Sequence, residues 1–125
     1  MTVLIVDDDA FTRDFLKSRA SAWGYEVMTA PGGDEAIVIL ETCDIDAVVL
    51  DYMMPEMDGI RTLGEIRKIN KDVPVIMFTG NPDPASMQGA ARLDISAYIP
   101  KSGARSDNQS LLKSALALIE KKLRK

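Results

Sequence analysis

The feature that most restricts the fold of this chain is the alternation of short apolar runs, rich in β-branched residues, with stretches of helical periodicity. Runs that are apolar at every position predict strands buried on both faces, and intervening helices predict a parallel sheet with right-handed crossovers. We therefore expect an α/β fold built as a three-layer sandwich. The predicted strands are Thr2–Val6, Tyr25–Thr29, Ala47–Leu50, Val73–Phe78 and Ala97–Ile99.

The helices between these strands begin at recognisable capping signals. An acidic or hydroxyl side chain before an apolar periodic stretch can accept the unpaired N–H groups of the first helical turn. The residues that we predict to start helices are Asp9, Asp34, Asp83 with Pro84, and Ser106 with Gln109.

Helical periodicity also predicts which helix residues face the core. We expect Phe11, Phe15 and Trp23 to be core residues of the first helix and its exit. In the last helix, the apolar residues fall within about half of the circumference and are predicted to cover the sheet. These residues are Leu111, Leu112, Ala115, Leu116, Leu118, Ile119 and Leu123.

Length and composition limit the class of protein. The chain has 125 residues, of which 46% are apolar and 27% charged, which is typical of one soluble domain. We expect a single domain over residues 1–125, with residues 120–125 as the start of a linker. No apolar run approaches the roughly 20 residues that span a bilayer, and no basic leader follows Met1. We therefore expect no membrane segment and a cytoplasmic location.

The residue types that are missing exclude several kinds of chemistry. The chain has no histidine and one cysteine, which rules out Ser-His-Asp and Cys-His arrangements and the commonest zinc ligands. The formal net charge is −4, which disfavours nucleic acid as a direct ligand. Carboxylate, hydroxyl and lysine groups must therefore carry whatever chemistry the chain performs.

Such groups follow four of the five predicted strands. Asp7 and Asp8 come directly after the first strand, Asp51 after the third, Thr79 after the fourth, and Lys101 shortly after the fifth. The carboxyl ends of parallel strands meet at one edge of the sheet, where ligands bind. We therefore predict a single site at this edge.

The residue types at this edge indicate a metal-dependent phosphoryl site. Adjacent carboxylates repel unless a cation neutralises them, and oxygen ligands without His or Cys favour a hard ion, Mg²⁺ more than Ca²⁺. Phosphoryl transfer needs a nucleophile, a metal and donors to the phosphoryl oxygens. Asp51 can supply the nucleophile, Thr79 a hydroxyl donor and Lys101 a positive charge.

At these positions the sequence resembles the receiver domain of two-component response regulators, and the resemblance covers essentially the whole chain. It is carried by four ordered segments, Val3–Asp9, Val48–Gly59, Val75–Gly80 and Ala97–Lys101. The resemblance implies a flavodoxin-like fold, with five helices around a five-stranded parallel sheet of order 2-1-3-4-5. It also implies a phosphorelay function, with a sensor histidine kinase or a histidine phosphotransfer protein as the partner that phosphorylates Asp51.

The resemblance implies a role for further residues. Mg²⁺, with Mn²⁺ as a substitute, would be bound by Asp8, Asp51 and the backbone carbonyl of Met53, and by Asp7 through water. Thr79 and Lys101 would sense the phosphoryl group, and Tyr98 would swing inward as Thr79 moves. The face formed by the fourth helix, the fifth strand and the fifth helix would then switch, and is expected to support a homodimer.

Two positions are expected to tune the lifetime of the phosphoryl group. Side chains at Met53 and Asn81 can orient or exclude the attacking water, and an apolar Met53 predicts no unusually fast self-dephosphorylation. The sequence departs from the family after Lys101, where Ser102 stands in place of the common proline.

Two other functions compete with this interpretation. A Mg²⁺-dependent phosphatase of the haloacid dehalogenase class also uses an aspartate after its first strand, but that class has Thr or Val where this chain has Phe11. A non-phosphorylated interaction module would keep the fold alone. Such a module has no need of Asp7, Asp8, Asp51, Thr79 and Lys101 together.

Overall fold

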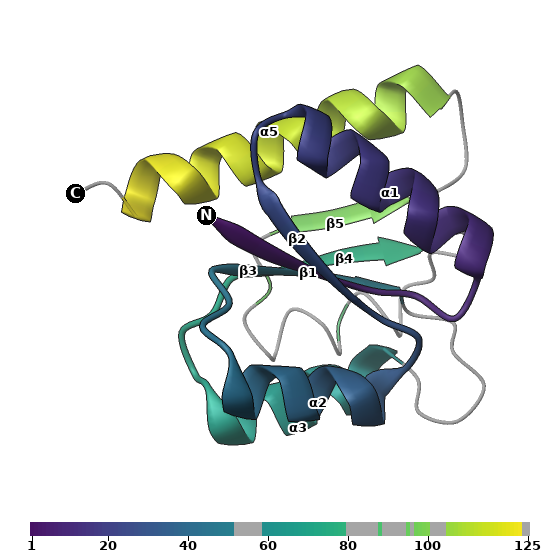
Figure 1. The fold of residues 1–125 in the computed structure, drawn as a ribbon. Coiled ribbons are helices and arrows are strands. Elements are labelled where there is room, and N and C mark those ends of the chain that lie inside the picture. Colours follow the sequence, from purple (N-terminus) through teal and green to yellow (C-terminus); the bar gives the residue numbers. More distant parts are fainter. Residues whose placement is uncertain (52–58, 80–87, 89–94, 96, 101–104, 124–125) are drawn as a thin grey trace.

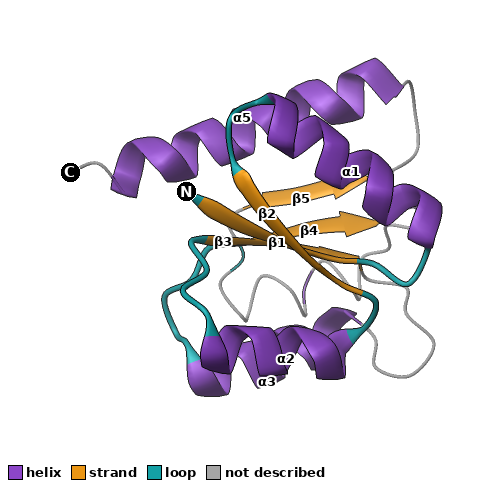
Figure 2. Ribbon diagram, viewed as in Figure 1, coloured by secondary structure: helices purple, strands orange, loops and turns teal. Residues whose placement is uncertain are grey.

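The computed structural model describes residues 1–51, 59–79, 88, 95, 97–100 and 105–123 of the chain (Figure 1). From residue 2 to residue 79, the described strands and helices alternate along the sequence (Figure 2). The strands are β1 (Thr2–Val6), β2 (Glu26–Ala30), β3 (Ala47–Asp51), β4 (Val75–Thr79) and β5 (Ala97–Pro100). The helices are α1 (Ala10–Ala22), α2 (Gly33–Thr42), α3 (Gly59–Ile69) and α5 (Arg105–Leu123). The helix start predicted at Asp83 and Pro84 lies outside the described residues.

The five strands form one parallel sheet in the order β2-β1-β3-β4-β5, which confirms the predicted topology. The register pairs Val6 of β1 with Leu50 of β3, so these two strands end side by side. β3 extends one residue beyond its predicted end because Asp51 pairs with Phe78 of β4. The last residue of β3 is therefore an aspartate held in the sheet.

Helices cover both faces of the sheet, as the uniformly apolar strands predicted. α1 and α5 lie on one face, and α2 and α3 lie on the other (Figure 1). Alternate residues of β1 and β3 face opposite layers, because successive side chains of a strand point to opposite faces. Val3, Ile5 and Val49 belong to the core under α1 and α5. Leu4, Val6, Val48 and Leu50 belong to the core under α2 and α3.

The prediction that Phe11 is a core residue was wrong. Its side chain is 68% exposed in the first turn of α1, whereas Phe15 and Trp23 are half-buried against the core as predicted. Phe11 precedes Leu16 and Ala20, the two buried residues of α1. The helix therefore turns its first aromatic residue away from the sheet, into solvent.

The predicted buried face of α5 was too wide. Leu112, Leu116 and Ile119 are buried at spacings of three and four residues, but Leu111 and Leu118 are 51% and 62% exposed. Leu111 and Leu118 are two helical turns apart and lie on a neighbouring stripe that does not reach the sheet. Leu123 is also exposed, at the end of α5 that projects beyond the sheet (Figure 1).

Two of the predicted helix starts are displaced. The prediction for Asp9 is confirmed, since it is the N-cap of α1 and accepts a hydrogen bond from the Thr12 N–H. α2 instead begins at Gly33 with Gly32 as a cap that makes no side-chain hydrogen bond, and α5 begins at Arg105, before Ser106. Asp34 lies in the first turn, where its charge is still favourable near the positive end of the helix dipole.

The contrast within α5 gives a stability prediction. Leu116 is fully buried, so we expect Leu116→Ala to lower the free energy of unfolding by about 2–5 kcal/mol through lost burial and a residual cavity. The same truncation at the exposed Leu118 should change it by less than about 0.5 kcal/mol. Urea denaturation followed by circular dichroism measures both variants. Equal losses for the two variants would contradict the orientation of α5.

No helix in the described ranges is both long and apolar enough to cross a membrane.

Candidate functional site

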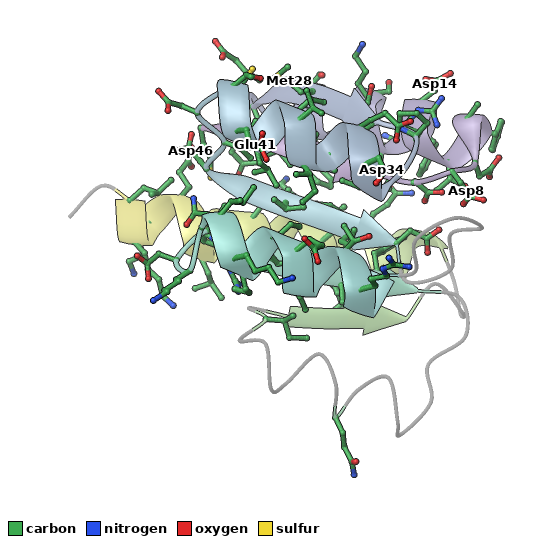
Figure 3. The ribbon with its side chains drawn as sticks, turned by 90° about the horizontal axis from the view of Figure 1, so that it is seen from below. Asp8, Asp14, Met28, Asp34, Glu41 and Asp46 are labelled. Atoms are coloured by element: carbon green, nitrogen blue, oxygen red, sulfur yellow. The ribbon has the colours of Figure 1, made fainter. Side chains whose placement is uncertain are left out.

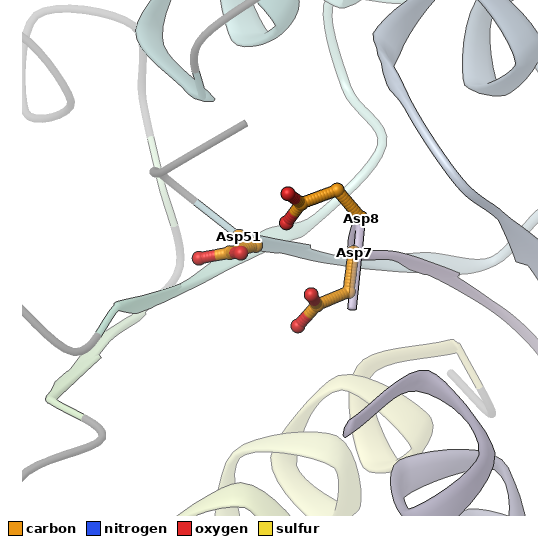
Figure 4. Close-up of side chains that lie close together, drawn as sticks. All are labelled: Asp7, Asp8 and Asp51. Atoms are coloured by element: carbon orange, nitrogen blue, oxygen red, sulfur yellow. The ribbon is translucent and has the colours of Figure 1, made fainter. Parts of the chain in front are cut away.

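Three aspartates meet where β1 and β3 end. Asp7 and Asp8 directly follow β1, and Asp51 is the last residue of β3. The carboxylate oxygens that these residues can offer to a metal lie within 4.8 Å of one another. The three side chains extend into the same space beyond the strand ends (Figure 4). The predicted convergence of these residues at one edge of the sheet is thus present in the structure.

The sheet topology explains why the site forms at this place. The chain leaves β1 through α1 to reach β2 on one side, and later returns to β3 on the other side of β1. α1 follows β1 and α3 follows β3, and these two helices lie on opposite faces of the sheet (Figure 1). Such a reversal of strand order is where open parallel sheets bind their ligands.

The burial of the three carboxylates differs, with a consequence for charge. Asp7 and Asp51 are 1% and 5% exposed, whereas Asp8 is exposed. Two ionised carboxylates whose oxygens lie within 4.8 Å of each other repel by roughly 3–4 kcal/mol at an effective dielectric constant of about 20. A cation that contacts all three removes this repulsion. The donor set consists of oxygens alone, so it fits a hard ion such as Mg²⁺.

Hydrogen bonds hold the turn between β1 and α1. The Asp9 N–H donates to Asp7 Oδ1 at 2.9 Å, and the Asp7 N–H donates to the carbonyl of Ala30 at 3.1 Å. Asp9 Oδ2 accepts a 2.6 Å hydrogen bond from Thr12 Oγ1. Arg13 Nη1 donates to the backbone carbonyl of Asp7 at 2.9 Å. Arg13 was not among the predicted site residues, because no capping or ligand motif includes a residue six positions after the first aspartate.

Asp46 is an acidic residue that lies away from this cluster. Asp46, which precedes β3, is at the opposite end of the sheet from Asp8 (Figure 3). Its Oδ2 accepts a 2.8 Å hydrogen bond from the Thr2 N–H at the start of β1. Asp46 therefore has a structural role and is separate from the candidate site.

The remaining predicted site residues are only partly described. Thr79 is the last residue of β4, next to β3 in the sheet, and pairs with Pro100 of β5. Tyr98 pairs with Met77 in the same ladder. The backbone thus brings Thr79 to the edge that carries the aspartates. The side chains of Thr79 and Tyr98, and the whole of Met53, Asn81 and Lys101, lie outside the described part of the structure.

The cap of α1 can be separated from the site by mutation. Asp9→Ala removes the acceptor for Thr12, so we expect a loss of about 0.5–2 kcal/mol in the free energy of unfolding. Phosphate uptake from a small donor should stay within about twofold, because Asp9 directs its carboxylate to the helix and not to the three acids. Chemical denaturation measures the change in the free energy of unfolding, and intact-mass kinetics measure phosphate uptake. Loss of phosphate uptake in a stably folded Asp9→Ala variant would assign Asp9 to the site.

Comparison with known proteins decides the family. The sequence matches the family described as response regulator receiver domain over residues 3–114. The chain belongs to this family. Its curated relatives include the probable transcriptional regulator ycf27 of Cyanophora paradoxa, 36% identical over 94% of this chain and 49% of the relative. The response regulator MprA of Mycolicibacterium vanbaalenii is 39% identical over 79% of this chain and 43% of the relative. The chain therefore spans about half the length of these relatives.

Solved structures agree with this assignment. The chemotaxis protein CheY4 of Vibrio cholerae has a TM-score of 0.83 and 27% identity, covering 93% of this chain and 96% of that chain. The response regulator TrrA of Thermotoga maritima, solved in complex with Mg(2+)-BeF, has a TM-score of 0.79 and 32% identity, covering 91% of this chain and 97% of that chain. The receiver fold therefore spans nearly the whole chain.

Membership of this family confirms the predicted class of function. The chain is a receiver domain of two-component signalling, as its sequence predicted. Receiver domains bind Mg²⁺ at an acidic pocket and interact with histidine kinases or phosphotransfer proteins. The acidic cluster of Asp7, Asp8 and Asp51 occupies the corresponding place in this chain.

Proposed function

We propose that Asp51 is the residue that accepts the phosphoryl group. An Asp51 carboxylate oxygen attacks the phosphorus of a phosphohistidine on the partner, forming an O–P bond while the N–P bond breaks. The imidazole nitrogen leaves with the electron pair and takes up a proton. The observation that carries the proposal is that Asp51 ends β3 within 4.8 Å of the oxygens of Asp7 and Asp8, so a metal that they hold also reaches the nucleophile.

Asp7, Asp8 and Asp51, with the backbone carbonyl of Met53, would hold the Mg²⁺ ion, and Mn²⁺ would substitute for it. When bound, this ion neutralises charge on the carboxylates and on the incoming phosphoryl oxygens. The exposure of Asp8 leaves one side of the site open to the donor. The Mg(2+)-BeF complex of the related TrrA supports a magnesium site of this type.

Thr79, Lys101 and Tyr98 would convert phosphorylation into a change of shape. Thr79 and Lys101 would bind the phosphoryl oxygens, and Tyr98 would move into the space that Thr79 leaves. The backbone supports this proposal by placing Thr79 and Tyr98 on the adjacent strands β4 and β5. The output face would consist of the predicted fourth helix, β5 and α5, where the exposed Leu111 and Leu118 supply apolar surface for a homodimer.

The domain would catalyse its own phosphorylation and dephosphorylation, with Met53 and Asn81 setting the rate of hydrolysis. We propose that residues 1–125 form one receiver unit that acts in the cytoplasm, without direct nucleic-acid contact. Because the match covers only half of the curated relatives, we carry over their receiver function and not their transcriptional function.

The partner protein would approach over the first turn of α1. Phe11 is 68% exposed there, three residues after Asp8, and an exposed aromatic beside a reaction site suits a protein partner. We expect Phe11→Ser to slow phosphoryl transfer from a protein phosphohistidine about tenfold. Transfer from acetyl phosphate should be unchanged, because no docking is needed. Equal slowing with both donors, measured by intact mass, would show that Phe11 supports the site and not docking.

The central experiment is incubation with Mg²⁺ and acetyl phosphate, followed by intact mass. A receiver should gain one phosphoryl group per chain and lose it on removal of the donor. A phosphatase of the haloacid dehalogenase class would instead turn over a phosphate monoester in excess over protein, and Asp7→Asn would abolish that turnover while Asp51→Asn would not. An interaction module would show neither activity.

A further inference from the structure

We propose that Arg13 is a positioning residue, which orients the peptide between Asp7 and Asp8 and thereby sets the geometry of the magnesium site. The inference rests on the proposed function, because it concerns the same three carboxylates. Arg13 Nη1 donates to the carbonyl oxygen of Asp7 at 2.9 Å. That carbonyl belongs to the peptide bond that joins the two aspartates.

This hydrogen bond controls the direction of two side chains at once. The peptide group is planar, so fixing its oxygen also fixes the direction of the Asp8 N–H and of the bonds to both Cα atoms. On the other side of Asp7, its Oδ1 accepts the 2.9 Å hydrogen bond from the Asp9 N–H. Asp7 is therefore held by two hydrogen bonds, one from Arg13 to its carbonyl and one from the Asp9 N–H to its carboxylate. Asp8 lies between Asp7 and Asp9 in the chain, so both hydrogen bonds restrict its backbone.

The anchor of Arg13 is rigid. Arg13 is half-buried in the second turn of α1, and its N–H donates to the carbonyl of Asp9 at 2.9 Å. α1 packs on the sheet through Leu16, and Ala20 of the same helix is also buried. The guanidinium thus ties the end of β1 to a helix that the core holds in place.

Two possible roles of Arg13 predict changes of opposite sign. If the guanidinium acts only through its charge, its removal makes the acidic site more negative and tightens the binding of any divalent cation. If it positions the aspartates, its removal weakens the binding of Mg²⁺, which demands near-ideal octahedral geometry. Ca²⁺ accepts irregular coordination, so its affinity should change little.

The experiment uses Arg13→Met, which keeps an aliphatic stem but has no donor, and Arg13→Lys, which restores a charge and a donor. Arg19→Met is the matched control, because Arg19 is exposed on the same helix and its replacement changes the charge by the same amount. The Cζ atom of Arg19 lies 5.3 Å from the centroid of the Phe15 ring. Mg²⁺ and Ca²⁺ affinities are measured by calorimetric titration. Thermal denaturation without metal measures the fold of each variant.

We expect Arg13→Met to weaken Mg²⁺ binding about tenfold, the size typical of residues that orient metal ligands. Ca²⁺ binding should weaken by no more than about twofold, Arg13→Lys should recover part of the Mg²⁺ affinity, and Arg19→Met should match the parent. Unchanged or tighter Mg²⁺ binding, or equal losses for both ions, overturns the proposal. A variant that is unfolded without metal assigns Arg13 to the fold and also overturns it. A parent protein that binds no Mg²⁺ overturns the proposed function itself.

Discussion

The Asp51→Asn variant is expected to take up no phosphate from acetyl phosphate and Mg²⁺, whereas the parent takes up one phosphoryl group per chain. The amide has no carboxylate oxygen to attack phosphorus, so the reaction loses its nucleophile and not only a favourable contact. The fold should survive, because one of the two buried carboxylates that lie within 4.8 Å of each other becomes neutral, which lowers the repulsion at the end of β3. Intact mass spectrometry measures phosphate uptake, and circular dichroism measures the fold.

The matched control for this experiment is Asp14→Asn. Asp14 is exposed on α1, and its replacement changes the net charge by the same amount. The control should take up phosphate like the parent. Phosphate on the Asp51→Asn variant, at a rate within tenfold of the parent, would place the acceptor at another residue and remove the basis of the proposed function.

Removal of Mg²⁺, by a chelator or by Asp8→Asn, is expected to slow phosphate uptake by about 100-fold or more. A metal that polarises phosphoryl oxygens supplies several kcal/mol to the transition state, and each 1.4 kcal/mol corresponds to about tenfold in rate. The same ion should stabilise the fold, because it binds the native cluster of three carboxylates and not the unfolded chain. At 100 times the dissociation constant this stabilisation is about 2.7 kcal/mol.

Thermal denaturation at increasing MgCl₂ measures the stabilisation, with NaCl at matched ionic strength as the control for screening. The parent and Asp14→Asn should gain stability with Mg²⁺. Asp8→Asn should gain much less, because one of the three ligands is gone. Equal stabilisation of Asp8→Asn and the parent would show that Mg²⁺ binds elsewhere.

Much of the fold could be predicted because local patterns and burial agree along the strands. β1 and β3 are apolar at successive positions, and the structure divides them between two cores, with Ile5 and Val49 on one face and Leu4 and Val48 on the other. A helix is less easily predicted from its pattern. In α5 the apolar residues outnumber those that the sheet can cover, so Leu111 and Leu118 remain exposed.

The candidate site was predictable for a related reason. In any parallel sheet the carboxyl ends of the strands share an edge, so polar residues that follow the strands lie along that edge, and the strand order then decides which of them are neighbours. The hydrogen bond from Arg13 to the Asp7 carbonyl was not predictable, because it depends on the angle at which α1 leaves the turn. That angle depends on how α1 packs on the sheet, where its Leu16 belongs to the buried core.

The sequence alone determined the layered architecture and the kinds of side chain at the ends of the strands, since strand periodicity and residue chemistry are local properties. Only the tertiary structure decided that Asp51 lies beside Asp7 and Asp8, that Phe11 faces solvent and that Arg13 reaches back to β1. The physical reason is that these relations depend on which strands pair and in which register. The pairing of Val6 with Leu50 results from the packing of the whole sheet between its helices, and neither strand specifies it by itself.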